Sequence, residues 1–442
     1  MLKRRYFKKL NEWKASPKHK SLIIIGARQV GKTFLVDAFA AENYSSYIRL
    51  NFLEQPDLKN IFSGNLDTAS LLLNISAYGM LGVPVPGKTL ILLDEIQECP
   101  NAAASLKFWT QDDRYDVIAT GSALGMNYTT SASWPVGYVE YMDMFALDFE
   151  EFLWAVGVSE DVIKELKTLF NERHPVPEFL HQKMLDYLRW YMVLGGMPEV
   201  ITAFLENHDF AAADAVQKRI YRDYLTDIAR LAPPQVKIRA EKCYRSVPLQ
   251  LSGDNHKFQY SLVESKGTSS RFETSIDWIR NAYMVKEVYN LKAIAYPAEL
   301  YKDESNFRLY PTDIGMLMAP FDLGTKKALL EEKTLEAPPS SIMLGTAKGG
   351  LFEALAADML MKGNHKDLYF YKNPKNTMEI EFFIMTSSGL IPIEIKAGRK
   401  KANSLNSVLE SGLVPYGYKM SSQNIGVAGK RITLPLYMLM FL

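Results

Sequence analysis

A glycine-rich stretch near the start of the chain has the residue types and the spacing that bind phosphate groups. GARQVGKT, residues 26–33, follows the apolar run LIII and matches G-x-x-x-x-G-K-T in full. The glycines allow backbone angles at which the N–H groups of the loop point at phosphate oxygens, and the N-terminus of a following helix adds partial positive charge. In this pattern the lysine reaches the β- and γ-phosphates and the hydroxyl binds Mg²⁺. The residues expected to bind ATP and Mg²⁺ are Gly26, Arg28, Gln29, Val30, Gly31, Lys32, Thr33 and Phe34.

Two further stretches end in polar residues that suit phosphoryl chemistry. TLILLDEIQ is an apolar run that leads into Asp94 and Glu95. Asp94 is expected to hold Mg²⁺, and Glu95 to orient and deprotonate the attacking water. YDVIATGS ends in hydroxyl residues that can touch the γ-phosphate or that water, although polar residues end many strands. The pattern favours hydrolysis over mere storage of a nucleotide. The expected catalytic residues are Lys32, Glu95, Thr120 and Ser122.

A second group of chemically suggestive residues lies near the C-terminus. TMEIEFFIM and LIPIEIKAG alternate as half-buried strands do, and TSSG between them predicts a hairpin. Pairing Met385 with Leu390 places Glu381 opposite Glu394, with Lys396 beside them. Two like charges at that separation are destabilising unless something neutralises them. A divalent cation such as Mg²⁺ or Mn²⁺ is one expectation, and an ordinary ion pair is the alternative.

The elements that position these residues follow a simple order along the chain. From residue 21 to about 147, apolar strands alternate with helices, which predicts a parallel sheet covered on both faces. Residues 148–235 have a helical pattern that ends at the linker-like LAPPQ. Residues 236–300 have the order helix, loop, helix, strand, which fits a small winged-helix domain. TKKALLEEKTLEAPPSS, residues 325–341, is expected to be a mobile connection before further helix and strands.

The winged-helix-like segment contains cations that can meet nucleic-acid phosphates. Lys266, Arg271 and Arg280 cluster around a predicted helix, although Glu273 and Asp277 dilute the charge. Binding through them is expected to depend on salt.

Length and composition set the outer limits. The chain has 442 residues, which predicts two to four domains, and its 48% hydrophobic and 23% charged residues are ordinary for a globular protein. A net charge of +1 gives no general affinity for nucleic acid. Cys99 and Cys243 form neither a zinc spacing nor a disulfide framework, which fits the cytoplasm. The basic start lacks the apolar segment of a signal peptide, and no apolar run is long enough to span a membrane, so a soluble protein is expected.

Several motifs together resemble those of a known family. GARQVGKT, LLDEIQ, ATGS, LDFEEFLWA, GGMPE and LYPTDIGML occur in this order in bacterial and archaeal AAA-type ATPases with a C-terminal domain of unknown function. The resemblance implies an α/β protein with a P-loop ATPase core (1–147), a helical lid (148–235), a winged-helix-like segment (236–300) and a nuclease-like α/β domain (301–442). It assigns the nucleotide roles to Lys32, Thr33, Asp94 and Glu95. Where family members often have Arg or Lys, this chain has Tyr138, so a γ-phosphate contact is expected to be missing or supplied by another arginine.

The C-terminal strands are similar to the PD-D/E-x-K nuclease superfamily. Glu381, Glu394 and Lys396 match its three positions, and Glu353 takes the place of its helical acid. In that mechanism the acids hold a metal, and the metal and the lysine activate water against a phosphodiester. Glu381 departs from the usual Asp, and its longer side chain shifts the metal. The alternative is a nuclease fold kept as a scaffold, with Glu379 and Lys396 as a cross-strand pair.

Two functions therefore remain open at this point. One is an ATP-driven enzyme that acts on nucleic acid. The other is a nucleotide-dependent switch that binds a partner protein and cleaves nothing.

Overall fold

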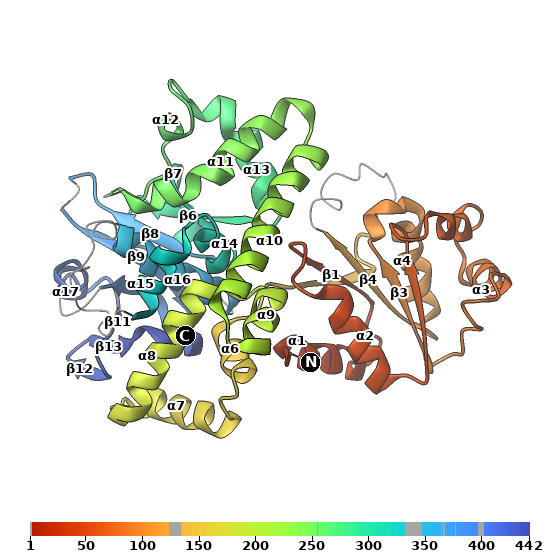
Figure 1. The fold of residues 1–442 in the computed structure, drawn as a ribbon, viewed down its shortest axis with the longest axis horizontal. Helices are drawn as coiled ribbons and strands as arrows, with labels where there is room; N and C mark the ends of the chain where they lie inside the picture. Colours follow the sequence, from red (N-terminus) through yellow and green to blue (C-terminus); the bar gives the residue numbers. More distant parts are fainter. Residues whose placement is uncertain are drawn as a thin grey trace. The chain divides into compact units, whose positions relative to one another are not determined.

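The chain divides into two compact units (Figure 1). The computed structural model describes residues 2–122, 134–253, 255–331, 347–363, 365, 367–375, 377–396 and 402–442. Unit 1 contains Lys3–Phe145 and Asn281–Tyr283, and unit 2 contains Leu2, Ala146–Arg280 and Met284–Leu442.

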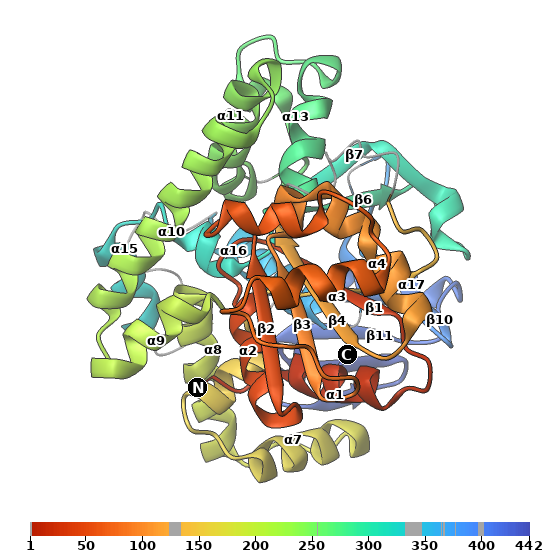
Figure 2. The same cartoon turned by 90° about the vertical axis from the view of Figure 1, so that its right-hand side faces the viewer.

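Unit 1 is built on a five-stranded sheet with the order β2-β3-β4-β1-β5, in which every pair is parallel. Figure 2 labels β2, β3, β4 and β1 of this sheet. The three apolar runs singled out in the sequence correspond to β1, β3 and β4. The strands are β1 (Ser21–Gly26), β2 (Ser46–Asn51), β3 (Thr89–Asp94), β4 (Asp116–Ser122) and β5 (Val139–Asp143). The helices are α1 (Arg5–Ala15), α2 (Lys32–Asn43), η1 (Pro56–Phe62), α3 (Thr68–Ala77), η2 (Ile96–Glu98) and α4 (Pro100–Asp112).

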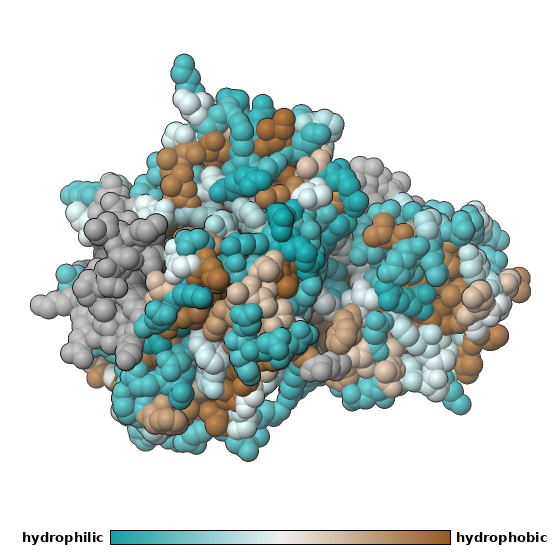
Figure 3. All heavy atoms as spheres, viewed as in Figure 1, coloured by the Kyte–Doolittle hydropathy of each residue, from teal (hydrophilic) through white to brown (hydrophobic). Residues whose placement is uncertain are grey.

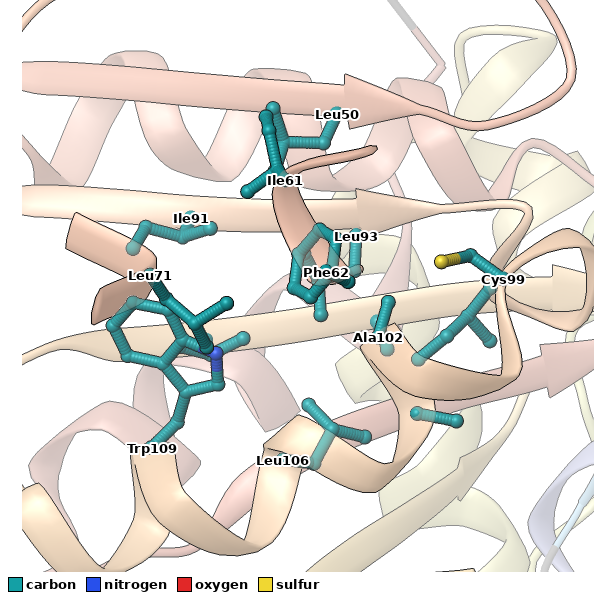
Figure 4. Close-up of a cluster of buried hydrophobic side chains, with 14 of the residues drawn as sticks. Leu50, Ile61, Phe62, Leu71, Ile91, Leu93, Cys99, Ala102, Leu106 and Trp109 are labelled. Carbon is teal, nitrogen blue, oxygen red and sulfur yellow. The ribbon is translucent and has the colours of Figure 1, made fainter. Parts of the chain in front are cut away.

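Helices cover both faces of this sheet, as the near-continuous apolar strands predict. On one face η1, α3 and α4 enclose a buried cluster that includes Phe62, Leu71 and Trp109 (Figure 4). On the other face α2 packs against β1–β4, and α1 packs against α2. The basic N-terminal segment is therefore an amphipathic helix that buries Tyr6 and Leu10, not a fully solvated one. The parallel sheet with the strand order 2-3-4-1-5 confirms the P-loop fold class.

Unit 2 combines a helical region with a mixed eight-stranded sheet of order β12-β13-β11-β10-β9-β8-β6-β7. Its helices are α6 (Phe149–Ala155), α7 (Glu160–Glu172), α8 (Glu178–Leu194), α9 (Pro198–Asn207), α10 (Phe210–Leu231), α11 (Pro234–Ser252), α12 (Tyr260–Val263), α13 (Ser269–Asn281), η3 (Ala298–Tyr301), α14 (Ile314–Met318), α15 (Leu323–Glu331), α16 (Ala347–Lys362), α17 (Asn403–Glu410) and η5 (Leu436–Phe441). Its strands are β6 (Val285–Leu291), β7 (Lys302–Pro311), β8 (Tyr369–Lys372), β9 (Glu379–Thr386), β10 (Gly389–Ile395), β11 (Gly417–Ser421), β12 (Gly426–Ala428) and β13 (Arg431–Pro435).

The predicted boundary at residue 300 does not separate domains. The order α11, α12, α13, β6, β7 is that of a winged helix, but the boundary falls between β6 and β7, which are paired antiparallel. β6 also pairs with β8, so the expected wing is part of the large sheet. The pairing of β6 with β8, which is distant in sequence, places β6 in the same sheet as the strands beyond residue 300.

The connection expected over residues 325–341 is in part a helix. Leu323–Glu331 form α15, and Lys326 in it is buried with its ammonium 2.6 Å from a carboxylate oxygen of Asp214. Residues 332–341 lie outside the described residues.

The strand that ends in Ile393, Glu394 and Ile395 is buried on both faces, which corrects the expectation of a half-buried strand. The helices α16 and α17 both pack against β10 and bury its side chains. The alternating pattern within the strand could not predict these contacts. Glu394 is therefore a buried acid, with an exposed fraction of 1%.

Two motifs that are far apart in the chain, GGMPE and LYPTDIGML, meet inside unit 2. The backbone N–H of Gly196 donates to Oδ2 of Asp313 at 2.7 Å. The ammonium of Lys362 lies 2.8 Å from the same carboxylate and 2.7 Å from that of Asp358, and all three charged groups are buried. Burial, with nearby Asp313, raises the pKa of Asp358 to about 6, although Lys362 opposes the shift. Buried charges of this kind need partners, and this network supplies them.

We expect Gly196→Ala to destabilise unit 2. A Cβ atom at this position would lie 2.0 Å from the carbonyl oxygen of Leu147, which real side chains do not tolerate. Such crowding lowers the free energy of unfolding by about 1–3 kcal/mol. Gly253→Ala is the control, because a Cβ there meets nothing within 4 Å and needs no positive φ. Urea denaturation that gives equal stabilities for the two variants would contradict this prediction.

On the face drawn in Figure 3, polar side chains predominate and hydrophobic ones are interspersed among them. Among the residues that the structure describes, no helix is both long enough and apolar enough to cross a membrane.

Candidate functional site

The glycine-rich loop lies between β1 and α2, as predicted, and its backbone has the special angles that such a loop requires. Gln29 and Gly31 have φ values of 65° and 92°. Gly26 is needed for another reason, because a Cβ atom there would lie 2.1 Å from the carbonyl oxygen of Met144. The loop can therefore turn tightly at the N-terminus of α2 with N–H groups available for phosphate oxygens.

Lys32 is a buried cation at the mouth of this loop. Its ammonium donates to the carbonyl oxygens of Gly26 at 3.1 Å and Ala27 at 2.8 Å. Burial lowers the pKa of Lys32 to about 8, although Glu95 and Asp94 favour its charged form. An anionic phosphate would stabilise the charged form further, so the site is electrostatically suited to bind one.

Asp94 is the centre of a polar cluster at the carboxyl end of the sheet. Its Oδ1 accepts hydrogen bonds from the hydroxyls of Thr33, at 3.1 Å, and Thr120. Its Oδ2 accepts from Asn51 at 3.0 Å and from the guanidinium of Arg49 at 2.8 Å. The predicted residues Thr33, Asp94 and Thr120 are thus brought together from α2, β3 and β4.

Sequence reasoning missed Arg49 and Asn51. Both lie on β2, where Asn51 is the register partner of Asp94. For Asn51 the signal was available in SYIRLN, because this residue ends its strand and parallel strands bring their carboxyl-terminal residues to one edge of the sheet. Arg49 holds Asp94 in one orientation.

The donors at this edge fit Mg²⁺. A threonine hydroxyl and an aspartate carboxylate are hard oxygen ligands, and Mg²⁺ in nucleotide sites takes one or two such groups and completes its shell with water and phosphate oxygens. The hydroxyl of Thr33 and Oδ1 of Asp94 are 3.1 Å apart, so both can face the same ion.

The other predicted residues of the site differ in their burial and in their contacts. Glu95 directly follows Asp94 in a left-handed conformation, with φ 54°, and accepts a hydrogen bond of 2.5 Å from Gln97. Ser122 ends β4 as the register partner of Gly26 and is buried. Phe34 is exposed on α2, while Val30 is buried in the loop. The roles assigned to these residues, and to Arg28, stay predictions.

Tyr138 lies at the opposite end of the sheet from the loop. Val139, the next residue, pairs with Ser21 at the start of β1, whereas the loop follows the end of β1 at Gly26. At about 3.3 Å per residue this separation is roughly 17 Å. The side chain at position 138 therefore does not contact a phosphate held by the loop of its own chain, and its being a tyrosine removes no such contact.

The acidic cluster of unit 2 forms with the predicted register. Met385 pairs with Leu390 and Phe382 with Ile393, which confirms the hairpin alignment as far as the residues next to Glu381 and Glu394. The ammonium of Lys396 lies 3.2 Å from Oε1 of Glu381 and 3.0 Å from Oε1 of Glu394. The charge that neutralises the two acids in the structure is this lysine. The suggested pair of Glu379 with Lys396 is wrong.

Glu353 and Glu379 are held by a second cation, Arg308. The guanidinium of this fully buried arginine contacts both carboxylates, and His256 and Tyr310 also contact Glu353. Burial raises the pKa of Glu353, but Arg308 and His256 outweigh it and bring the pKa to about 2. Sequence reasoning missed Arg308 and His256, which are 45 and 97 residues from Glu353.

These contacts do not fit a metal centre. Among the described residues, which include Glu353, Glu381 and Glu394, no group of three or more His, Cys, Asp or Glu side chains is placed to hold a metal ion. Burial raises the pKa of Glu381 to about 7, which weakens it as a metal ligand near neutral pH, although Lys396 opposes the shift. The stretch GRKK that follows Ala397 lies outside the described residues.

The cations expected to meet nucleic acid are in part already paired. Arg271 lies 2.7 Å from Glu264, and Arg280 contacts Asp277 at 2.6 Å and Glu287 at 2.7 Å. Lys266 is exposed. Phosphates would have to displace carboxylates from two of the three cations.

Comparisons with known families agree with the geometry of unit 1. Residues 18–153 match the family model described as "AAA domain". Residues 185–327 match a "Domain of unknown function (DUF8612)" and residues 348–433 a "Domain of unknown function (DUF4143)". The strand order, the phosphate loop, the Asp94 cluster and this match define residues 18–153 as an AAA-type P-loop ATPase domain, which confirms the class indicated by the motifs.

Solved structures that resemble the chain are distant. The Walker-type ATPase PABY2304 of Pyrococcus abyssi is 15% identical with a TM-score of 0.43, and the match covers 72% of this chain and 95% of that one. The Aeropyrum pernix ORC1 protein in complex with DNA is 14% identical, with a TM-score of 0.27 and coverage of 74% and 91%. AMPPCP-bound DnaA from Aquifex aeolicus is 14% identical, with a TM-score of 0.28 and coverage of 63% and 86%. A search of curated proteins found no match.

Proposed function

We propose that unit 1 binds ATP with Mg²⁺ and hydrolyses it to ADP and phosphate. The observation that carries this proposal is the convergence of the Thr33 and Thr120 hydroxyls on Oδ1 of Asp94, beside the buried ammonium of Lys32. A P-loop that only stored a nucleotide would not need the adjacent Glu95.

Each residue has a distinct part in this chemistry. Lys32 exchanges its two carbonyl partners for phosphate oxygens and neutralises their charge. Thr33 and Asp94 would hold Mg²⁺, which supplies stabilisation of the charge that develops on the phosphates. Arg49 and Asn51 keep Asp94 oriented. Glu95 accepts the proton of the attacking water.

The direct test is phosphate release from ATP by the full chain. We expect release in Mg²⁺ and its loss in EDTA. Thr33→Ala should lose the Mg²⁺-dependent rate, because it removes the ligand hydroxyl, whereas Ser63→Ala removes an exposed hydroxyl elsewhere in unit 1 and should leave the rate unchanged. A wild-type rate that is equal in Mg²⁺ and EDTA would refute the proposal.

For unit 2 we favour the nucleotide-dependent switch over the nuclease. Lys396 binds Glu381 and Glu394, and Arg308 binds Glu353 and Glu379, so each acid of the nuclease-like pattern already has a protein cation. Replacing such ion pairs by a metal would leave buried cations without partners, which is costly. The nucleotide cycle then changes the conformation of unit 2 for binding of a partner protein.

Cys99 and Cys243 are both free thiols, which favours a reducing compartment such as the cytoplasm.

We expect Mn²⁺ to leave the melting temperature of the wild-type chain unchanged and to support no cleavage of DNA or RNA. A ligand that binds only the folded state would raise the melting temperature. Lys396→Ala is the informative variant, because it leaves Glu381 and Glu394 without their ammonium, and Mn²⁺ should then stabilise the fold. A rise in the wild type that Glu394→Ala abolishes, together with cleavage, would favour the nuclease.

We also propose that Lys266, Arg271 and Arg280 make salt-dependent contact with nucleic acid. Because two of these cations are paired with carboxylates, we expect any duplex binding to be lost between low and moderate salt.

A further inference from the structure

One side chain of the N-terminal segment joins the phosphate loop to the segment that leaves unit 1. The guanidinium of Arg4 donates from Nη1 to the carbonyl oxygen of Val30 at 2.9 Å and from Nη2 to the carbonyl oxygen of Phe145 at 2.6 Å. These carbonyls are 26 and 141 residues away in the chain. The planar guanidinium presents its donors in a fixed fork, so one side chain can bind two such acceptors at once.

The contact with Val30 orients a phosphate-binding group. The carbonyl of Val30 and the N–H of Gly31 belong to one planar trans peptide, so they point in opposite directions. By holding the carbonyl, Arg4 directs the N–H of Gly31 to the other side of the loop. In G-x-x-x-x-G-K-T loops the N–H groups next to the lysine are the ones that meet phosphate oxygens.

The contact with Phe145 fixes the chain just after β5. Met144 donates its N–H to the carbonyl of Ile25 at 2.7 Å, and its own carbonyl oxygen packs against Gly26. The N–H of Phe145 donates to the hydroxyl of Tyr6 at 3.1 Å, and the Arg4 guanidinium lies over the Tyr6 ring at 5.4 Å. Met144, the neighbour of Phe145, is therefore in contact with the first residue of the loop.

Within unit 2 the chain is fixed again almost at once. Leu147 donates its N–H to the carbonyl of Gly196 at 2.7 Å, and its own carbonyl accepts from the Tyr191 hydroxyl at 2.9 Å and the Lys362 ammonium at 3.2 Å. Phe145 belongs to unit 1 and Ala146 to unit 2, so a single residue separates the anchored positions Phe145 and Leu147.

We propose that Arg4 is the positioning residue that sets the phosphate loop for ATP and transmits its occupancy to the segment Phe145–Leu147. This inference rests on the proposed ATP binding and adds the route by which the bound nucleotide acts on the rest of the chain. When phosphate binds the N–H of Gly31, the orientation of the Val30–Gly31 peptide becomes fixed. Because the Arg4 guanidinium is hydrogen-bonded to both carbonyls, it then restrains Phe145 as well.

The test compares four full-length proteins: the wild type, Arg4→Ala, Arg4→Lys and Lys8→Ala. Lys8 is an exposed cation on α1, the helix that begins directly after Arg4, so Lys8→Ala controls for loss of positive charge from this segment. Calorimetry with ATP and with adenosine separates phosphate binding from binding of the base and sugar. Hydrogen exchange of residues 144–147, with and without ATP, reports on the linking segment.

We expect Arg4→Ala to weaken ATP binding about 10-fold and to leave adenosine unaffected, because it removes charge-assisted hydrogen bonds that act only on the phosphate cradle. ATP should slow exchange at residues 144–147 in the wild type and in Lys8→Ala but not in Arg4→Ala. Arg4→Lys should give an intermediate affinity, because lysine keeps the charge and reaches one carbonyl.

The outcomes are distinguishable. If wild-type protein binds ATP and Arg4→Ala binds it equally well with the same exchange, the inference fails and the proposed function stands. Equal weakening of ATP and adenosine would also overturn it, because that result indicates a general loss of structure. If Arg4→Ala does not fold, Arg4→Lys decides, and wild-type affinity in that variant overturns the proposal. No ATP binding by the wild type would overturn both.

Discussion

Lys32→Ala is expected to weaken ATP binding by roughly 100-fold, the loss that corresponds to removing a strong charge-assisted hydrogen bond. The ammonium is buried at the mouth of the loop, so no water-exposed cation can replace it easily. Calorimetric titration of the variant with ATP and Mg²⁺ measures the effect. Lys59→Ala, which removes a half-exposed lysine paired with Glu98, is the matched control and should bind as the wild type does. Wild-type affinity in Lys32→Ala would defeat the assignment of the loop.

The pH dependence of binding gives an independent check on Lys32. Burial lowers the pKa of its ammonium to about 8 in the nucleotide-free protein, and a bound phosphate must raise it. Above pH 8 the complex therefore holds more protons than the free protein, and by linkage the affinity falls as the pH rises. We expect constant affinity below pH 8 and a decline that approaches about tenfold per pH unit above it. Titrations at pH 9 in buffers of different ionisation enthalpy should show proton uptake, and Lys32→Ala should show none.

Glu95→Gln is expected to bind ATP normally and to hydrolyse it at least about 100-fold more slowly, the lower range of what a positioned general base contributes. The glutamine keeps the size of the side chain and can still accept a hydrogen bond from Gln97, but it cannot take a proton from water. Single-turnover phosphate release measures the chemical step directly.

Glu98→Gln is the control for this change. It makes the same substitution three residues away in the same short helix segment, at an acid that is paired with Lys59 on the surface. Its turnover should equal that of the wild type. If Glu95→Gln also turns over at the wild-type rate while ATP still binds, another residue is the base.

Much of the nucleotide site was predictable because its residues are set by local rules. The phosphate loop needs a glycine at position 31, because φ is 92° there. It also needs a strand before it and a helix after it, and all of these are contiguous in sequence. Asp94 could be placed beside the loop because parallel strands end at one edge of a sheet. Arg49 could not, since nothing in SYIRLN says which acid its side chain will meet.

The hairpin of unit 2 shows the same limit. Its register was predictable because a short turn links Met385 to Leu390 and fixes every pair behind them. That register places Glu381 near Glu394, but it says nothing about what neutralises them. In the structure Lys396 lies between these two acids, and Arg308 from β7 and His256 from the segment before α12 contact Glu353, the acid of α16.

The sequence by itself determined the class of unit 1, its phosphate loop, the acid that ends β3 and the alignment of β9 with β10. Each depends on residues within one strand, one turn or one strand–loop–helix unit. Within such a unit the number of residues between two positions fixes how far apart they lie in space. Only the tertiary structure decided that β6 joins the large sheet, that Tyr138 lies at the far end of its sheet, and that Arg4 reaches both Val30 and Phe145. These are contacts between residues far apart in the chain, and they arise from burial of apolar surface that brings together polar groups whose partners no local pattern specifies.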